Sequence, residues 1–285
     1  MKHIPLLSQE HFPSDHSYVR SSTSVFKTLL EKHEWFDTFY LKNGVEFWRR
    51  EEIFGAFFAR YIFERTEEEP DIHWLKRKYG WWHGKVIWIP IRRKIIPSWW
   101  KASSYSPHFS EMGLTYLDES YLKKWDTKVR WSRRTHFFEQ GGTIKQVSNQ
   151  DYFTYFCEFP DYYPYKNFSI QQYHGMATYA GENLRNYIAF LWDIPVAWLS
   201  ALDYGNEKKS TFHFLVFTRK EFYSSQSGTA LVDVWFQESL RLWVKYIDFD
   251  RLMKPWGPKT QVWYTVFKHH FIDVHFHFDA YEKWF

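Results

Sequence analysis

The chain has 285 residues, enough for two modest domains or one large one, with a proper core in either case. Aromatic residues make up 23% of the sequence, which excludes the disordered and low-complexity classes. The formal net charge is a modest +4, but the basic residues come in clusters. These clusters are residues 76–78, residues 92–94, and a third made of Lys123, Lys124, Lys128, Arg130, Arg133 and Arg134. The ordinary interpretation of any one such cluster is a solvated face.

Two further features of the sequence bear on where the protein resides. No stretch approaches the roughly 20 consecutive apolar residues that a membrane-spanning helix needs. The N-terminus lacks the apolar run of a signal peptide, and the single Cys157 excludes an internal disulfide framework. We therefore expect a cytoplasmic protein.

The first half of the chain gives broad signals. Residues 51–65 carry apolar side chains at helical spacing, which predicts a helix with one buried stripe. Residues 85–96 are rich in β-branched residues and contain Pro90, which predicts an edge strand or two short strands. A loop or strand with Trp99 and Trp100 follows at residues 97–105.

The second half gives sharper signals. Asn149 and Ser169 each precede a helical pattern and are candidate N-caps. Residues 185–192 and 196–204 read as a hairpin, and residues 211–218 as a third strand. A helix with Asp233 and Gln237 on its polar face follows, and residues 245–250 form a fourth strand. We expect one more strand, which carries Lys268.

A short turn lies between the third strand and the helix. It consists of Ser227, Gly228, Thr229 and Ala230. Free N–H groups and the helix dipole at such a position attract anions, and phosphate is the natural ligand. A single glycine before a helix is more often only a cap. The prediction of an anion site therefore depends mainly on the strands before and after this turn.

This order of strand, glycine turn, helix and strand, followed by the Phe-Lys pair in VFKHHF, resembles the C-terminal half of the GNAT superfamily. It is most similar to the FemA/FemB/FemX-like branch of acyl and aminoacyl transferases. The resemblance covers residues 128–271 best. It implies an α/β fold with a GNAT-like mixed sheet flanked by helices, in two tandem GNAT-like halves of which the first is diverged. We expect the halves at residues 1–127 and 128–285, with the acyl donor bound by the second.

The resemblance also implies a reaction. An acyl or aminoacyl group would move from a coenzyme A or tRNA carrier to an amine-bearing acceptor, such as a nucleotide-linked cell-wall precursor. The turn at Gly228 would bind the donor's phosphates, Lys268 would stabilise the transition state, and Arg133 with Arg134 would bind an anionic substrate. Many acetyl-CoA-binding members carry a Gln or Arg three residues before the glycine, whereas Gln226 stands two residues before Gly228. That departure weakens the argument for coenzyme A.

Acyl transfer also needs a place for the displaced proton. Asp248 and Asp250 alternate along one strand, so both carboxylates are expected on one face. Asp248 is a catalytic candidate and Asp250 a candidate for binding the acceptor amine, although both could equally form a polar strand surface. Tyr246 is a candidate general acid among 20 tyrosines. We interpret His213 as a satisfied core histidine.

Two other patterns have ordinary explanations. The polar residues Asp273, His275, His277 and Asp279 share one face of a final strand. His-x-His is a fair metal pair, but a strand with its polar side toward solvent explains it, and we expect no metal. A mixture of tryptophans and basic residues could form core, an acceptor cleft or a membrane-interface surface, and peripheral membrane contact is the least favoured of these. The residues are Trp81, Trp82, Trp88, Trp99 and Trp100, near Arg92, Arg93 and Lys94.

Two alternatives to an enzyme stay open at this point. One is a non-catalytic GNAT-like scaffold that binds a nucleotide-bearing ligand or a partner protein. The other is a nucleic-acid-binding module that uses the basic and aromatic residues.

Overall fold

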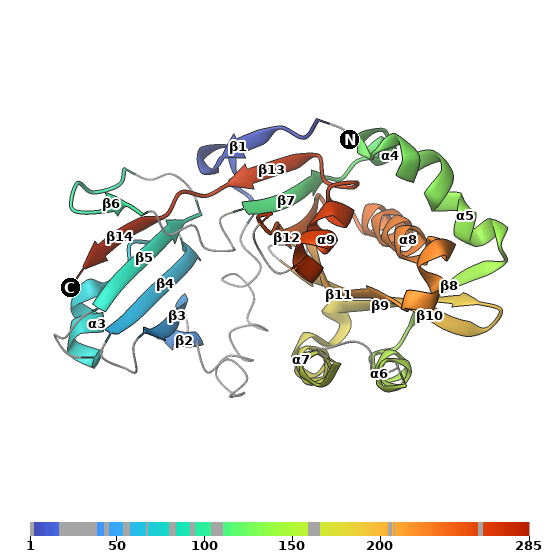
Figure 1. Cartoon of the computed structure of the whole chain (residues 1–285), viewed down its shortest axis with the longest axis horizontal. Helices are drawn as coiled ribbons and strands as arrows, with labels where there is room; N and C mark the ends of the chain where they lie inside the picture. The colour runs from blue at the N-terminus through green and yellow to red at the C-terminus, as the bar shows by residue number, and fades with distance from the viewer. Residues whose placement is uncertain are drawn as a thin grey trace. The chain divides into compact units, whose positions relative to one another are not determined.

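The computed structural model describes residues 3–16, 39–42, 46–53, 58–66, 68–79, 84–91, 95–103, 111–158, 166–204, 207, 209–255 and 259–284. The chain forms two compact units, each assembled from separate stretches of sequence. The first contains residues 1–4, 114–249 and 267–273, and the second contains residues 5–113, 250–266 and 274–285. Figure 1 shows the elements of both units in their chain order.

The first unit is built on a mixed sheet. Its strand order is β7 (Glu111–Tyr116), β12 (Tyr246–Arg251), β11 (Ser210–Thr218), β10 (Ile194–Tyr204), β9 (Leu184–Leu191) and β8 (Gly142–Val147). Strands β8 to β11 are antiparallel neighbours, whereas β11 and β12 are parallel. The turn between β9 and β10 has φ of 50° at Trp192 and 64° at Asp193, as a two-residue hairpin turn requires. The predicted hairpin, third strand and fourth strand are therefore confirmed.

Helices cover both faces of this sheet (Figure 1). Helix α8 (Ser227–Arg241) packs on one side, while α6 (Asn149–Cys157) and α7 (Lys166–Ala180) lie on the other. The remaining helical elements are α4 (Tyr121–Lys124), the π-helix η3 (Val129–Arg133), α5 (Arg134–Glu139), and the short helices η4 (Gly181–Asn183) and η6 (Lys220–Ser225). Ser148, one residue before the predicted Asn149, caps α6, because its hydroxyl accepts from the N–H of Asp151 at 3.0 Å. Helix α7 begins at Lys166 rather than after Ser169.

The second unit contains a six-stranded sheet. Its order is β2 (Phe39–Lys42), β3 (Glu46–Ile53), β4 (Phe58–Thr66), β5 (Gly84–Pro90), β14 (Tyr281–Trp284) and β6 (Lys101–Ala102). Helix α3 (Ile72–Tyr79) connects β4 to the parallel β5. Strands β1 (Leu6–Ser8) and β13 (Val274–His277) are parallel neighbours at the β7 end of the eight-stranded sheet, and the short helix η1 (Gln9–His11) follows β1. Helix α9 (Lys259–Lys268) also begins in this unit.

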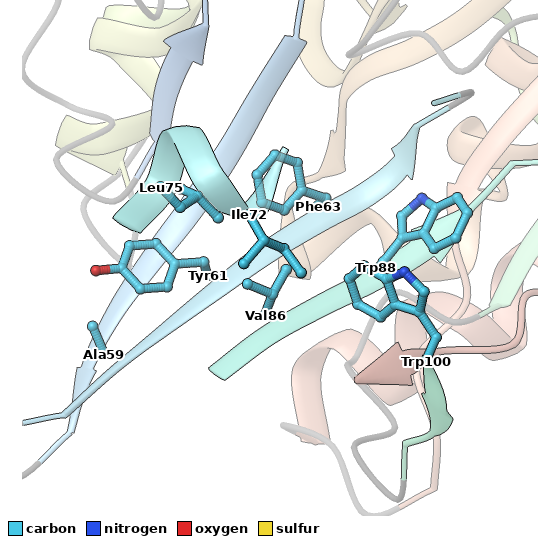
Figure 2. Close-up of a cluster of buried hydrophobic side chains, with 8 residues drawn as sticks. All are labelled: Ala59, Tyr61, Phe63, Ile72, Leu75, Val86, Trp88 and Trp100. Atoms are coloured by element: carbon cyan, nitrogen blue, oxygen red, sulfur yellow. The ribbon is translucent and has the colours of Figure 1, made fainter. Parts of the chain in front are cut away.

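Aromatic and branched side chains fill the core of the second unit (Figure 2). Ala59, Tyr61 and Phe63 alternate along β4 and pack with residues of α3 and β5. The predicted helix at residues 51–65 is wrong, because this period-two pattern places a strand there; residues 54–57 lie outside the described ranges. Trp88 and Trp100 are core residues whose ring centroids lie 5.3 Å apart.

Strand β5 corrects another expectation. It pairs with β4 on one side and β14 on the other, so it is a central strand rather than an edge strand. Pro90 is its last residue, where a missing N–H costs little. Residues 81, 82 and 92–94 are not among the described residues, and Trp99 is exposed.

The two units repeat one pattern. In each, antiparallel strands lead into a helix that crosses over to a parallel strand: β3, β4, α3 and β5 in the second unit, and β10, β11, α8 and β12 in the first. The parallel pairs differ in length. Strands β4 and β5 pair from Ala59 to Thr66, whereas β11 and β12 pair over three residues. Within the described ranges, no helix is both long and apolar enough to cross a membrane.

Candidate functional site

The parallel strands β11 and β12 separate partway along their length. Ser210 pairs with Tyr246, Thr211 with Ile247, and Phe212 with Asp248. Strand β11 continues to Thr218, but it has no further pairing with β12 in the described structure. We call this place the strand opening and define it by His213, Asp248 and Phe249.

Three side chains bind the end of β12 at the strand opening. The Nζ of Lys268 donates to the carbonyl oxygen of Phe249 at 2.7 Å. The Nδ1 of His213 lies 3.3 Å from the carbonyl oxygen of Asp248. The hydroxyl of Tyr204 donates to Oδ2 of Asp248 at 2.6 Å. Side chains from β10, β11 and α9 therefore meet β12 where its pairing with β11 has stopped.

This cluster is buried. Asp248 is 0% exposed and Lys268 is 6% exposed, while Tyr204 and His213 are also buried. Lysine and aspartate are rarely buried unless they are paired or have a functional role. The sequence pattern predicted a strand around Lys268, but the residue ends helix α9. The apolar and β-branched residues before it favoured a strand in isolation, and packing makes the segment helical.

Helix α8 begins against the end of β11 and the last turn of α9, the helix that carries Lys268. Gln226 adopts a left-handed conformation with φ of 61°, and Gly228 is the second residue of the helix rather than part of a turn. A Cβ on Gly228 would lie 3.1 Å from Oγ1 of Thr218 and 3.8 Å from Cζ of Phe267. The glycine thus lets the start of α8 approach the end of β11 and the last turn of α9.

The hydrogen-bond donors at this helix start are largely used within the protein. The N–H of Ser227 donates to Oγ of Ser225 at 3.3 Å. The N–H groups of Thr229 and Ala230 both donate to the carbonyl oxygen of Gln226, at 3.0 and 3.2 Å. The predicted cradle of four N–H groups is therefore reduced to that of Gly228.

Two donors at the start of α8 lack acceptors in the described part of the chain. The hydroxyl of Ser227 is fully buried and has no hydrogen-bond partner in the described part of the chain. The N–H of Gly228 likewise meets no acceptor among those residues. A buried hydroxyl and an N–H at the positive end of a 15-residue helix fit an anionic oxygen, such as one phosphate of a donor.

The other predicted site residues lie elsewhere. Tyr246 belongs to the paired part of β12, and its buried ring contacts that of Tyr116 with centroids 5.6 Å apart. Asp250 has φ of 49°, so the period-two argument that put it on the same face as Asp248 does not extend to it. Its Oδ2 lies 3.6 Å from Nε of Arg251.

The two predicted arginines differ in their surroundings. Arg134 reaches Oδ2 of Asp233 at 3.3 Å, and Asp233 also accepts from Tyr121 at 2.7 Å. Burial raises the pKa of Asp233, against the opposing effects of Tyr121 and Arg134. Asp233 is buried, although the sequence placed it on a polar helix face. The half-buried side chain of Arg133 makes no hydrogen bond or ion pair with any described residue.

Sequence reasoning missed Tyr204 and assigned His213 to the core alone. Tyr204 ends β10, and β11 lies between that strand and β12. A hydrogen bond across an intervening strand leaves no periodic signal in the sequence. His213 is buried and has a carbonyl partner, as expected for a satisfied core histidine, but its partner belongs to the strand opening.

The histidines of β13 lie close to the carboxylate of Glu111 in the second unit. Nε2 of His275 lies 3.0 Å from Oε2 of Glu111, Nδ1 of His277 lies 3.8 Å from Oε1, and Lys254 also contacts Oε1. Burial alone would raise the pKa of Glu111, but these three neighbours hold it well below its ordinary range. Among the described residues, no group of His, Cys, Asp and Glu has the geometry to hold a metal ion.

Glu111→Gln is expected to lower the free energy of unfolding at pH 7 by about 1–3 kcal/mol, because it removes a charged acceptor from three donors. The pKa of Glu111 is lowered by folding, so its contribution is present above the unfolded value of about 4.5 and is lost as the pH falls below it. Urea unfolding at pH 7 and pH 3 should show the difference from wild type shrinking at pH 3. Exposed Glu119→Gln is the matched control, and an equal difference at both pH values would contradict the prediction.

Comparisons with known proteins bear on the fold. No protein-family model matches the sequence, and no curated protein matches it significantly. Among solved structures, the chain is similar to FemX, with a TM-score of 0.63 and 8% identity over 96% of this chain and 93% of that one. It is also similar to a conserved protein of unknown function from Bacteroides thetaiotaomicron, with a TM-score of 0.57 and 9% identity over 96% of this chain and 94% of that one.

A third similar structure is described as the C-terminal domain of a lysylphosphatidylglycerol synthetase from Agrobacterium fabrum. Its TM-score is 0.50, with 11% identity over 92% of this chain and 88% of that one. The structural similarity establishes a shared fold, and sequence identities this low leave the reaction open. The repeated crossover pattern and these structural similarities show that the chain has a FemX-like GNAT fold of two GNAT-like halves.

Proposed function

We propose that this protein transfers an acyl or aminoacyl group from a coenzyme A or tRNA carrier to an amine, with the strand opening as its active site. One observation carries the proposal: where β11 and β12 separate, the buried Lys268 donates to the carbonyl oxygen of Phe249, and its neighbour Phe267 lies near the start of α8, which has two donors without acceptors among the described residues. In the second unit the corresponding strands β4 and β5 stay paired. This contrast supports residues 128–285 as the half that binds the donor.

The donor's anionic part would lie at the start of α8. The hydroxyl of Ser227 and the N–H of Gly228 are the groups we assign to one phosphate oxygen. Thr229 and Ala230 would contribute through the helix dipole, since their N–H groups are already bonded. A site with so few open donors accommodates one phosphate more readily than a pyrophosphate.

The chemistry follows from the buried cluster. The acceptor nitrogen would attack the acyl carbon, forming a C–N bond, while the carbonyl oxygen becomes negative and Lys268 stabilises it. The displaced proton would pass to Tyr204, whose own proton moves to Asp248 across their 2.6 Å hydrogen bond. As the C–S or C–O bond to the carrier breaks, the same pair returns a proton to the leaving group, which restores Tyr204 and Asp248.

Three other residues keep secondary roles in the proposal. Arg133 would attract an anionic acceptor, such as a nucleotide-linked cell-wall precursor, and Arg134 would support it from its ion pair with Asp233. Asp250 would bind the acceptor amine. Tyr246, which lies in the paired part of β12, would act by supporting that strand.

A non-catalytic scaffold is the alternative, and one observation favours it. Three of the four N–H groups at the start of α8 are bonded within the protein, which limits how tightly a phosphate donor could be held. Such a scaffold would bind a nucleotide-bearing ligand or a partner protein without turnover.

Thermal unfolding with acetyl-CoA, longer acyl-CoA thioesters and aminoacyl-tRNA tests the proposal. A donor present at 100 times its Kd should stabilise the folded protein by about 2.7 kcal/mol and raise Tm. Gly228→Val should abolish the shift, because its side chain would crowd Thr218, which lies 3.1 Å from the Cβ position, and displace the donor. Gln150→Val, at the second residue of α6, is the matched control and should keep the shift.

The outcomes separate the two candidate functions. A shift with any donor, lost in Gly228→Val alone, supports donor binding, and turnover of that donor with an amine panel supports transfer. A shift without turnover favours the scaffold. The absence of a shift with every donor would refute the proposed donor site.

A further inference from the structure

The helical segment at residues 121–140 concentrates positive charge on the first unit. It contains six Lys and Arg residues and two acidic residues, Asp126 and Glu139, which gives a net charge of +4. That equals the formal net charge of the entire chain. The remaining basic and acidic residues are equal in number, so this segment carries the net positive charge of the protein and is suited to attract anionic partners.

A π-helix shapes the surface of this segment. The π-helical turn Val129–Arg133 runs directly into α5. Such turns are rare in proteins, and those that occur are often found at functional sites. Val129 and Phe137 are fully buried, whereas Trp131 is 70% exposed and Phe138 is 42% exposed. Two large apolar side chains are thus presented to solvent from the same segment that carries the cations.

Three of these cations have no carboxylate partner among the residues that the structure describes. The side chains of Lys123 and Arg133 make no hydrogen bond or ion pair with the described residues. Arg130 donates to the carbonyl oxygen of Lys123 at 3.5 Å, and its Nε is buried without an acceptor in that part of the chain. By contrast, Lys124 pairs with Asp118 at 2.6 Å and Arg134 with Asp233 at 3.3 Å.

We propose that this basic-aromatic surface, defined by Lys123, Arg130, Trp131, Arg133 and Phe138, docks on an anionic lipid bilayer. The inference goes beyond acyl transfer and does not depend on it. Trp131 and Phe138 are seven residues apart, about two helical turns, so both side chains can enter one plane. Tryptophan side chains next to lysine and arginine are enriched where proteins contact the headgroup level of a bilayer.

The surroundings of Trp131 favour a bilayer over RNA. The guanidinium of Arg130 lies over the Trp131 ring, 5.2 Å from its centroid. One face of the ring is therefore covered, whereas stacking on nucleic acid bases uses open ring faces. A ring with a guanidinium on one side can still insert edge-on among headgroups, with the cation beside a lipid phosphate.

Sedimentation with lipid vesicles tests the docking surface. The full-length protein should sediment with vesicles that contain phosphatidylglycerol and stay in solution with pure phosphatidylcholine. Lys123→Ala should weaken binding by about fivefold, the contribution of one basic residue near an anionic surface. Trp131→Ala with Phe138→Ala should weaken it further. Trp192→Ala is the matched control, because Trp192 is 71% exposed elsewhere on the first unit and should leave binding unchanged.

Each other outcome overturns the proposal. No sedimentation with anionic vesicles at low salt excludes a lipid-binding surface of this strength. Equal sedimentation with both kinds of vesicle, or equal losses in Trp192→Ala, would mean that the contact is not made by these residues. Binding to single-stranded RNA without binding to vesicles would assign the surface to nucleic acid. Because all the changed side chains are exposed, an unchanged Tm in each variant shows that folding is intact.

Discussion

Replacing Lys268 by methionine is expected to lower turnover by about 10²–10³-fold with any donor that binds, if this lysine stabilises the developing oxyanion. Methionine keeps the length of the side chain and removes its charge. Lys268 and its neighbours at the strand opening are buried, and a fixed cation stabilises a nearby anion more strongly in a buried site than in solvent. Initial rates with an amine panel, at donor concentrations above KM, are the measurement.

The same lysine has a structural contact that needs its own control. Its Nζ donates to the carbonyl oxygen of Phe249, so its removal should also cost about 1–3 kcal/mol of unfolding free energy. Lys124 makes an equivalent contact, because its Nζ donates to the carbonyl oxygen of Tyr116. Lys124→Met should therefore reduce stability comparably and leave turnover near wild type. Equal turnover losses in the two variants would reduce Lys268 to a structural role.

The sequence predicted the second half of the fold well because its signals are local. The β9–β10 hairpin, β11, α8 and β12 each follow from side-chain periodicity within one short segment. The turn chemistry agrees at Asp193, because aspartate tolerates positive φ, whereas Trp192 is not a residue usually found there. The resemblance added Lys268, which contacts the strand opening, and the Gly228 region, which lies near Thr218 at the end of β11 and near Phe267 of α9.

The rest depended on contacts between distant segments. The strand opening is a loss of pairing between β11 and β12, and the residue types along a strand do not predict where its pairing ends. The bond from Tyr204 to Asp248 spans 44 residues and crosses a strand. Strand β5 was mistaken for an edge because β14, its second neighbour, comes nearly 200 residues later in the chain. At residues 51–65, helical spacing and strand alternation coincided, and tertiary packing decided between them.

Asp203→Ala is expected to destabilise the protein by about 3–5 kcal/mol, the typical cost of removing one partner from a buried ion pair. Arg185 donates from Nε to Oδ2 of Asp203 at 2.8 Å and from NH2 to Oδ1 at 2.7 Å. Both side chains are buried, at 6% and 7% exposure. Without Asp203, the guanidinium would keep its charge among neutral hydroxyls such as that of Ser239, at 2.9 Å. Urea unfolding at pH 7 is the measurement.

Two comparisons make this second test specific. Glu238→Ala removes the surface ion pair with Arg241, whose N–O distance of 2.6 Å is close to the 2.7 Å of the buried pair. Because Arg241 is 72% exposed, this change should lower the free energy of unfolding by less than about 1 kcal/mol. Arg185→Met with Asp203→Leu should recover much of the loss, because it leaves no buried charge without a partner. If Asp203→Ala costs no more than Glu238→Ala, the network does not hold the unit together.

This network also bears on the proposed site. Arg185 on β9 contacts Asp203 on β10, Thr211 on β11 and Ser239 on α8, so one guanidinium joins the strands and the helix around the strand opening. Thr211 accepts in addition from the indole N–H of Trp235 on α8, at 3.1 Å. Ser239 lies twelve residues after Ser227 on α8, so this network fixes the later turns of the helix to the sheet. We propose that a rigid α8 passes this constraint on to Ser227 and Gly228 at its start.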